Sequence, residues 1–281
     1  MTDAVVGPRR AAVLGSPIGH SLSPVLHRAA YAALGLDGWT YEAYDVAELS
    51  LKSFLDGLDS SWAGLSLTMP LKAAVLELLD VTSPLVTAVG GANTVLLDGR
   101  LRRGENTDVP GIVAALQEKG VDRFGTATVL GGGATARSVV AALARMAGSV
   151  TAYVRSEGRA TQLRAVAAAT GAALQVAGWG NAADGLGADL VVNTTVAGAA
   201  DGLAARLPDA TTTLFEVLYD PWPTPLAQSW SARGGHVVNG LDLLVHQAIL
   251  QVGLMTRASV DVPALVPLLR AAGERALDAR G

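Results

Sequence analysis

A glycine-rich turn near the middle of the chain restricts the fold more than any other feature of the sequence. Gly131 closes a predicted strand at 126–131, and Gly133 and Ala136 follow at the start of a helical pattern. In turns of the form Gly-x-Gly-x-x-Gly/Ala the second glycine lets the backbone approach a pyrophosphate, and the helix N-terminus faces the phosphates. The pattern therefore predicts a dinucleotide site formed by Gly131, Gly132, Gly133, Ala134, Thr135 and Ala136.

The end of the next predicted strand indicates which dinucleotide binds. An NAD site usually has an acidic residue there, about 20 residues after the glycines, to bind the ribose 2′-hydroxyl. This chain has Arg155 and Ser156 at that place, and Arg159 follows. Arginine binds a phosphate bidentately, although charges at the start of a helix can also be merely solvated. We predict NADP as the cofactor, with Arg155, Ser156 and Arg159 as ligands.

The composition fits an α/β fold and argues against some partners. Of the 281 residues, 50% are hydrophobic but only 5% are aromatic, so Ala, Val and Leu must build the core, and 32 glycines allow close packing of helices on a sheet. The net charge is −4, with no long basic run. We therefore expect no nucleic-acid partner and no binding to an anionic membrane.

Several kinds of chemistry lack the residues they need. The sequence has no cysteine, which excludes disulfides and thiolate catalysis, and it has no Gly-x-Ser-x-Gly elbow of a serine hydrolase. The four histidines show no metal-ligand spacing, so we expect no metal. The N-terminus lacks a signal-peptide pattern, and no run of about 18 apolar residues occurs. We expect a cytoplasmic protein.

Predicted strands and helices alternate along the chain, without an internal repeat or a low-complexity linker. The strands are expected at 11–15, 39–46, 63–69, 126–131, 149–154, 174–179, 188–195 and 212–219. The helices are expected at 24–35, 48–58, 71–80, 109–119, 134–148, 158–171, 241–256 and 263–278. This order favours an α/β fold of two domains that are joined by secondary structure.

A predicted hairpin carries polar residues on both sides of its turn. Asp98-Gly99 favours a type I′ turn, which would place Asn93 opposite Gly104, with Asn106 about two residues further on. Such residues often only satisfy loop backbone, and Asp108 would then be the N-cap of the helix at 109–119. Alternatively, the hairpin brings these side chains to one edge of a binding site.

Two other polar stretches lie in the first third of the chain. Ser21 and Ser23 occupy alternate positions, so both hydroxyls point the same way if the segment is extended. Thr68 ends a predicted strand, and Lys72 falls in the first turn of the next helix. The positive end of the helix dipole would lower the pKa of a lysine at that place. Both features also have an ordinary explanation. Serines before a proline often only form a turn, and a lysine at this place is often only an exposed side chain.

Together these motifs resemble the shikimate dehydrogenase family over nearly the whole chain. The blocks run in family order: GSPIGHSLSPVLH, GLSLTMPLK, GGANTVLLDGRLRRGENTDVPG, VLGGGATAR, VRSEGR, NTTVAG, LYDPWPTPL and NGLDLLVHQA. The resemblance implies a substrate domain of residues 1–108 completed by helices at 241–281, and a Rossmann NADP domain at 109–240. In the family the pocket holds a small polyhydroxylated cyclohexene carboxylate.

The resemblance also implies roles for single residues. Lys72 and Asp108 match the catalytic pair. The matching substrate residues are Ser21 and Ser23 for the carboxylate, Thr68, Asn93 and Asp108 for the ring hydroxyls, and Tyr219 and Gln247 for further contacts. Asn106 would support the same edge. Thr194, Val217 and Gly240 match further cofactor contacts.

Three positions depart from the family pattern, namely Ser66, Arg28 and Leu243. Ser66 replaces a usual Asn, and its shorter side chain is expected to reach the substrate through water. The leading hypothesis is NADP-dependent reduction of 3-dehydroshikimate to shikimate by a monomer or homodimer. The alternatives are a quinate or aminoshikimate dehydrogenase, and a catalytically silent NADP-binding regulator. The silent regulator is disfavoured because Lys72 and Asp108 are both present.

Overall fold

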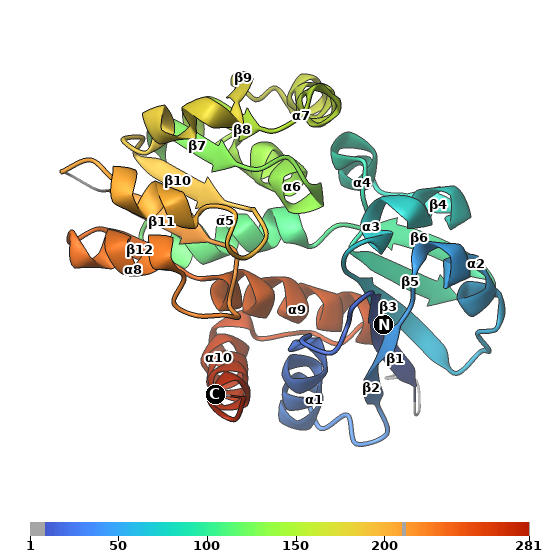
Figure 1. The fold of residues 1–281 in the computed structure, drawn as a ribbon. Coiled ribbons are helices and arrows are strands. Elements are labelled where there is room, and N and C mark those ends of the chain that lie inside the picture. Colours follow the sequence, from blue (N-terminus) through green and yellow to red (C-terminus); the bar gives the residue numbers. More distant parts are fainter. Residues whose placement is uncertain (1–8, 210–211, 281) are drawn as a thin grey trace. The chain divides into compact units, whose positions relative to one another are not determined.

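The computed structural model describes residues 9–209 and 212–280, which fall in two compact units (Figure 1). The first unit comprises Met1–Thr107 and Leu244–Gly281, and the second comprises Asp108–Leu243. The first division lies one residue before the predicted boundary at 108/109, and the second lies three residues after the predicted boundary at 240/241. Helix α9 (Gly240–Thr256) therefore begins in the second unit and continues in the first.

The described strands of the first unit form one mixed sheet in the order β2-β1-β3-β5-β6-β4. Its strands are β1 (Arg10–Gly15), β2 (Thr40–Asp45), β3 (Trp62–Leu67), β4 (Val81–Thr82), β5 (Thr94–Asp98) and β6 (Leu101–Glu105). β1 pairs in parallel with β2 and β3, whereas β5 is antiparallel to both β3 and β6. All six residues of β3 are buried. The apolar run at 63–69 is thus a central strand with both faces covered, as such runs predict.

Two of the described helices of the first unit, α4 and α10, begin with a side-chain cap. They are α1 (Ser23–Ala33), α2 (Glu48–Asp56), α3 (Leu71–Ala74) with the 3₁₀ turn η1 (Val75–Leu78), α4 (Pro84–Val89), most of α9, and α10 (Val262–Asp278). The side chains of Ser83 and Asp261 accept a hydrogen bond from the first turns of α4 and α10. α1 and α10 lie side by side (Figure 1). The core includes Leu14, Leu51 and Leu65, all fully buried.

The described strands of the second unit form an all-parallel sheet in the order β12-β11-β10-β7-β8-β9. They are β7 (Phe124–Leu130), β8 (Ala147–Val154), β9 (Leu174–Gly178), β10 (Leu190–Asn193), β11 (Thr213–Glu216) and β12 (His236–Val238). Read along the chain, this is the doubly wound order 3-2-1-4-5-6. The strand order reverses between β7 and β10, where such sheets bind dinucleotides.

Helices cover this parallel sheet, as expected for parallel strands. They are α5 (Asp108–Glu118), α6 (Ala134–Leu143), α7 (Glu157–Thr170), α8 (Pro225–Ala232) and the 3₁₀ turns η2 (Trp179–Gly185) and η3 (Asp201–Arg206). α6 packs against both α5 and α7. One core cluster joins Leu130 and Leu214 of the sheet to Trp230 of α8, which is fully buried. The two-domain α/β prediction is confirmed, and the helices α4 and α8 and the strands β4 and β12 are elements that the sequence pattern did not predict.

The hairpin turn differs from the predicted type I′ geometry. Asp98 pairs with Leu101 across the hairpin, so the turn residues are Gly99 and Arg100. Gly99 has φ +62°, and Arg100 is not among the residues with positive φ. A single positive φ at the first turn position fits type II′ instead. Gly104 pairs with Val95, and Thr94 pairs with Glu105, so the predicted pairing of Asn93 with Gly104 is wrong.

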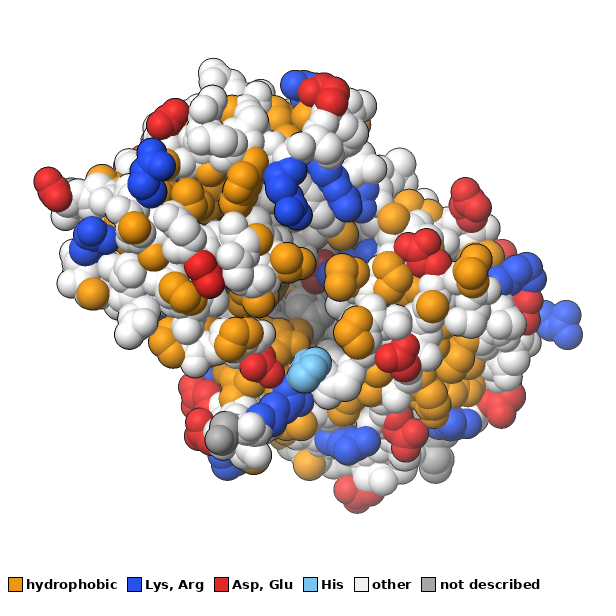
Figure 2. Space-filling model, in the orientation of Figure 1, with side chains coloured by type: hydrophobic (Ala, Val, Ile, Leu, Met, Phe, Trp, Pro, Cys, Tyr) orange, Lys and Arg blue, Asp and Glu red, His pale blue; other side chains and the backbone are white. Residues whose placement is uncertain are grey.

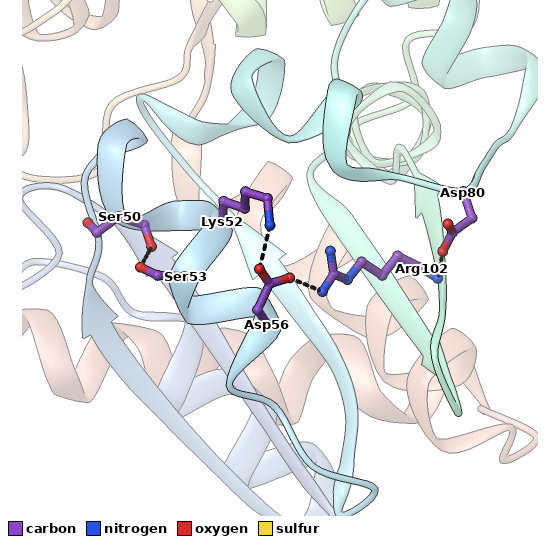
Figure 3. A network of polar contacts seen from close by, with 6 residues as sticks. All are labelled: Ser50, Lys52, Ser53, Asp56, Asp80 and Arg102. Carbon is purple, nitrogen blue, oxygen red and sulfur yellow. Dashed lines mark hydrogen bonds and ion pairs between the residues drawn. The ribbon is translucent and has the colours of Figure 1, made fainter.

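A surface network ties α2 to the hairpin of the first unit (Figure 3). Asp56 on α2 accepts hydrogen bonds from Lys52 at 2.5 Å and from Arg102 on β6 at 2.8 Å. These bonds, from Lys52 first and then Arg102, lower the pKa of the Asp56 carboxyl. Asp80 in turn accepts from the backbone N–H of Arg102 at 2.7 Å. Exposed pairs of this kind stabilise little, so the network mainly fixes the side chain of Arg102.

In the part of the chain that the structure describes, no helix is long and apolar enough to cross a bilayer.

Candidate functional site

The predicted dinucleotide turn lies between β7 and α6, at the point where the strand order reverses. Gly131 has φ +109°, which residues with a side chain rarely adopt, and a Cβ there would lie 2.6 Å from Thr194 Oγ1. A Cβ on Gly133 would meet nothing within 4 Å. Gly133 therefore leaves its backbone accessible beside the N-terminus of α6, where a pyrophosphate would approach.

Basic side chains gather over α6 and beside α7 (Figure 2). Arg155 and Ser156 follow β8 directly, and Arg159 lies in the first turn of α7; all three are exposed. Arg159 also donates a long hydrogen bond to the Gly132 carbonyl, at 3.5 Å. The predicted 2′-phosphate ligands and the glycine turn are therefore neighbours in the structure.

Arg137 is a candidate cofactor residue that the sequence reasoning missed. It lies in the first turns of α6, is only 8% exposed, and its Nε has no hydrogen-bond partner. Burial first, and then the charge of Arg159, lower the pKa of the Arg137 guanidinium. A buried cation beside a second cation is unfavourable unless an anion binds there. An arginine immediately after the fingerprint was the signal in the sequence.

Thr194 and Val217 directly follow the strands β10 and β11, which the sheet places next to each other. The Thr194 hydroxyl donates to the Leu130 carbonyl at 2.8 Å, so this side chain lies against the glycine turn. Gly240 donates its backbone N–H to the Leu218 carbonyl at 3.2 Å, which holds it beside Val217. The three predicted cofactor residues thus lie along the carboxyl edge of the parallel sheet.

A buried carboxylate fixes this edge, and the sequence reasoning missed it. Glu216 is 0% exposed and accepts from both Asn193, at 2.8 and 3.1 Å, and Thr224, at 3.1 Å. It also accepts from the backbone N–H of Leu218 at 3.3 Å. Burial raises the pKa of the Glu216 carboxyl, while these hydrogen bonds act against that rise. Asn193 and Glu216 therefore hold the loops that follow β10 and β11 in one arrangement.

In the first unit, Ser21 and Ser23 are close in space but do not form the predicted extended segment. The Ser21 N–H donates to the Ile18 carbonyl at 3.0 Å, which closes a turn, and Leu22 has helical φ and ψ. Ser23 is the first residue of α1, and its N–H donates to Ser21 Oγ at 3.3 Å. The prediction failed because Pro24 starts the helix here and draws Ser23 into it.

Thr68 and Lys72 bracket the short connection between β3 and α3. The Thr68 carbonyl accepts from Leu71 N–H at 2.8 Å, and the Lys72 carbonyl accepts from Ala92 N–H at 2.8 Å. Lys72 is therefore held beside the segment that carries Asn93. The predicted helix at 71–80 is a single α-helical turn followed by a 3₁₀ turn. The helix dipole at Lys72 is therefore weaker than that of the ten-residue helix we expected.

Asn93 is buried and fully engaged by the chain around it. Its Oδ1 accepts from the Thr107 N–H at 2.8 Å, and its Nδ2 donates to the Thr107 hydroxyl at 2.8 Å. A longer bond of 3.4 Å joins Nδ2 to Gln247 Oε1 on α9. Asn106 donates to the Gly91 carbonyl at 2.9 Å. The structure thus brings together Asn93 and Gln247, and Asn106 supports the same hairpin end, as expected.

Ser66 is also buried, and its hydroxyl is used by two side chains. It accepts from the Tyr41 hydroxyl at 2.6 Å and donates to Gln251 Oε1 at 2.7 Å. A hydroxyl has one hydrogen, so Ser66 retains only a lone pair for any further partner. Tyr41 and Gln251 were not predicted, because a tyrosine in an alternating strand and a glutamine in a helix are ordinary residues there.

Asp108 and Tyr219 belong to the second unit. Asp108 is the first residue of α5, is 5% exposed, and starts the helix one residue earlier than predicted. Tyr219 is half-buried and follows the Glu216 loop. The pairing of Asp108 with Lys72 remains a prediction.

His27 on α1 should make the stability of the protein sensitive to acid. It is 0% exposed, and burial lowers its pKa from 6.5 to about 4, although the bond from its Nδ1–H to the Ser23 carbonyl acts the other way. Below pH 6.5 the His27 imidazole is therefore protonated in the unfolded chain but stays neutral in the folded chain. The stability of the fold is consequently lost as the pH falls from 6.5 towards 4.

Between pH 7.5 and 5 this uptake should cost the wild type about 2 kcal/mol of unfolding free energy, a cost that His27→Phe removes. Urea unfolding at the two pH values measures it. His236→Gln is the control, since His236 is exposed and should leave the wild-type difference in place. An unchanged difference in His27→Phe would show that His27 does not cause the acid sensitivity.

The sequence and the fold are both similar to those of known proteins. The family model described as "Shikimate dehydrogenase substrate binding domain" matches residues 13–95. A curated relative, "Shikimate dehydrogenase (NADP(+))" of Moorella thermoacetica, is 34% identical over 277 residues, which cover 93% of this chain and 92% of the relative.

Two solved structures bear on the ligands. Shikimate 5-dehydrogenase from Thermus thermophilus, in complex with NADP(H) and shikimate, matches with a TM-score of 0.80 and 34% identity, covering 94% of this chain and 99% of that chain. Quinate dehydrogenase from Corynebacterium glutamicum, in complex with NAD, matches with a TM-score of 0.83 and 26% identity, covering 95% and 100%. The fold is thus shared by enzymes that differ in substrate and cofactor.

Proposed function

Because the chain belongs to the shikimate dehydrogenase family, we propose that it catalyses the reversible, NADP-dependent reduction of 3-dehydroshikimate to shikimate. The observation that carries this proposal is the 34% identity to an NADP-dependent shikimate dehydrogenase over 93% of the chain, which includes both units. The protein would then act in the synthesis of aromatic compounds, and we propose that it does so in the cytoplasm, as a monomer or homodimer.

The residues of the second unit fit NADP better than NAD. Gly133 leaves open space beside the N-terminus of α6, as a pyrophosphate requires. Arg155 and Arg159 supply cations at the end of β8 where an NAD site would have an acid, and Arg137 adds a buried cation. When bound, NADPH supplies the hydride of the reduction. The proposed cofactor ligands are the glycine turn, these arginines, Ser156, Thr194, Val217 and Gly240.

The first unit supplies most of the proposed substrate ligands. Ser21 and Ser23 would hold the carboxylate through neutral hydroxyl donors, which suits a chain of net charge −4 without a long basic run. Thr68, Asn93 and Gln247 would contact the ring oxygens. Ser66, Tyr219 and Asp108 complete the proposed set, and Ser66 can only accept a hydrogen bond there because its hydrogen is engaged by Gln251.

Lys72 and Asp108 would provide the acid–base catalysis of the reaction. Reduction of the ketone generates negative charge on its oxygen, and the Lys72 ammonium would stabilise that charge and donate a proton to the oxygen. Asp108 would accept a hydrogen bond from the ammonium or the reacting hydroxyl, which orients the lysine towards the reacting oxygen. In the reverse direction Lys72 would take the proton from the hydroxyl of shikimate.

We expect the protein to prefer shikimate to quinate. Quinate carries an extra hydroxyl on the carboxylate-bearing carbon, which is tetrahedral, so the groups nearest that carbon discriminate, namely Ser21, Ser23 and Tyr219. A site that leaves this hydroxyl unpaired rejects quinate strongly, whereas a site that merely tolerates it rejects by about 100-fold at most. The kcat/KM for shikimate should exceed that for quinate by at least about 100-fold at saturating NADP.

An absorbance assay with six pairs of reactants tests the proposal and its alternatives. Purified protein is mixed with shikimate, quinate or aminoshikimate and with NADP or NAD, and the reduced cofactor is measured. Turnover with shikimate and NADP supports the proposal. Similar kcat/KM values for both acids would indicate a quinate/shikimate dehydrogenase. NADP binding without turnover of either acid, or of aminoshikimate, would indicate a catalytically silent NADP-binding protein.

A further inference from the structure

A directed chain of buried hydrogen bonds crosses the first unit from β2 to the hairpin. The Tyr41 hydroxyl donates to Ser66 at 2.6 Å, and the Ser66 hydroxyl donates to Gln251 Oε1 at 2.7 Å. Gln251 Nε2 donates to the Thr94 hydroxyl at 2.9 Å, which donates to Asn93 Oδ1 at 2.9 Å. All five residues are between 0% and 4% exposed. Each group donates to the next, so the chain has one direction.

Two backbone groups fix that direction. Gln251 Nε2 also donates to the backbone carbonyl of Asn93 at 3.1 Å, and a carbonyl can only accept. The amide of Gln251 must therefore point its oxygen at Ser66. At the other end, the backbone N–H of Thr107 can only donate, and it donates to Asn93 Oδ1 at 2.8 Å. The first bond thus fixes the orientation of the Gln251 amide, and the second fixes the orientation of the Asn93 amide.

The packing of α9 on the sheet places Gln251 within reach of Ser66. A Cβ on Gly64 would lie 2.8 Å from Met255 Cγ, so this glycine lets α9 approach β3 closely. Gln251 lies one helical turn before Met255, and Ser66 lies two residues after Gly64 on the same face of the strand. Both polar side chains therefore meet next to the close contact of helix and strand.

We propose that Gln251 is a positioning residue for the substrate site, which acts through Thr94 on the amide of Asn93. This inference rests on the proposed function, in which Asn93 contacts a ring oxygen. Oδ1 of Asn93 accepts from Thr94 and from the Thr107 N–H, so both of its lone pairs are used. Asn93 can then offer the substrate only an N–H, in place of its 3.4 Å bond to Gln247. The chain of hydrogen bonds thereby makes the Asn93 side chain a donor to a substrate oxygen.

The variant Gln251→Met tests the role, because methionine keeps the volume but cannot donate or accept in this chain. It should raise the KM for shikimate about tenfold, change kcat much less, and leave the KM for NADP unchanged. Thr94→Val breaks the same chain at the next bond and should have the same effect, whereas Thr94→Ser keeps the hydroxyl and should retain the wild-type KM. Since the two losses act along one path, the double variant should be no worse than the more affected single variant.

Thr256→Val is the matched control for loss of a buried polar group on α9. Thr256 is 4% exposed, donates to the Val252 carbonyl at 2.7 Å, and has no bond to the chain described above. It should leave the KM for shikimate unchanged. If Gln251→Met fails to fold, Thr94→Val and Thr94→Ser decide the question without altering α9.

Three results would overturn the positioning role. These are a wild-type KM in Thr94→Val or in folded Gln251→Met, an equal rise in KM in Thr256→Val, and independent effects that multiply in the double variant. Activity of the wild type is measured first with shikimate and NADP. Its absence would overturn the proposed function together with this inference, whereas an active wild type with unaffected variants would overturn this inference alone.

Discussion

Replacing Lys72 with alanine should lower kcat for shikimate oxidation by about 10²–10⁴-fold, the range that a positioned general acid or base contributes. The affinity for NADP should hardly change, because Lys72 lies in the first unit and the glycine turn lies in the second. Steady-state kinetics with shikimate, together with a binding titration of NADP, measure both quantities. A fall in kcat with unchanged cofactor affinity is expected when a group acts on the reacting atoms.

Lys52→Ala is the matched control for this experiment. Lys52 is also a lysine of the first unit, but its side chain is 69% exposed and pairs with Asp56 at the surface (Figure 3). Its loss should leave kcat unchanged. If Lys72→Ala retained near wild-type turnover, Lys72 would have no part in the mechanism.

Replacing both Arg155 and Arg159 by glutamine should shift the cofactor preference from NADP towards NAD. Only NADP carries the 2′-phosphate, and each lost charge-assisted hydrogen bond costs about 1.5–3 kcal/mol. NADP binding should weaken by roughly 10- to 100-fold for each arginine, while NAD binding should change little. The dissociation constants of both cofactors, measured by fluorescence or calorimetric titration, give the result directly.

The control is Arg164→Gln on the same helix. Arg164 is exposed and pairs with Glu157, so its removal changes the charge of α7 without removing a proposed phosphate ligand. It should leave the ratio of the two dissociation constants unchanged. Equal losses of NADP and NAD affinity in the Arg155/Arg159 variant would instead show that these arginines are structural.

The second unit was the easier part of the fold to predict. Its glycine turn has one common structural context, and alternating apolar strands and helices leave few topologies other than a parallel sheet. Short elements were missed because local pattern is weak there. The helix α8 has only eight residues, and β4 has two. The turn type failed because the sheet register placed Gly99, and not Asp98, at the first turn position.

The site residues were predicted from motifs, whereas the groups that hold them were not. Glu216 contacts Asn193, which ends the preceding strand of the sheet, and Gln251 contacts a much more distant segment, so no local motif reveals either residue. Gln251 reaches Ser66 across 185 positions of the chain. Tyr41 looked like an ordinary alternating strand residue, and only its 2.6 Å bond to Ser66 shows that its hydroxyl is used.

The transfer of a labelled hydride tests the central claim most directly. The protein is incubated with NADP and with shikimate that carries deuterium on the carbon whose hydroxyl is oxidised, and the reduced cofactor is analysed by mass spectrometry. Lys72→Ala, purified in the same way, controls for a contaminating host enzyme. The proposed function predicts one deuterium in each molecule of NADPH formed by the wild type and far slower formation by the variant. Reduced cofactor without the label, equal rates in both preparations, or no reduced cofactor at all would contradict it.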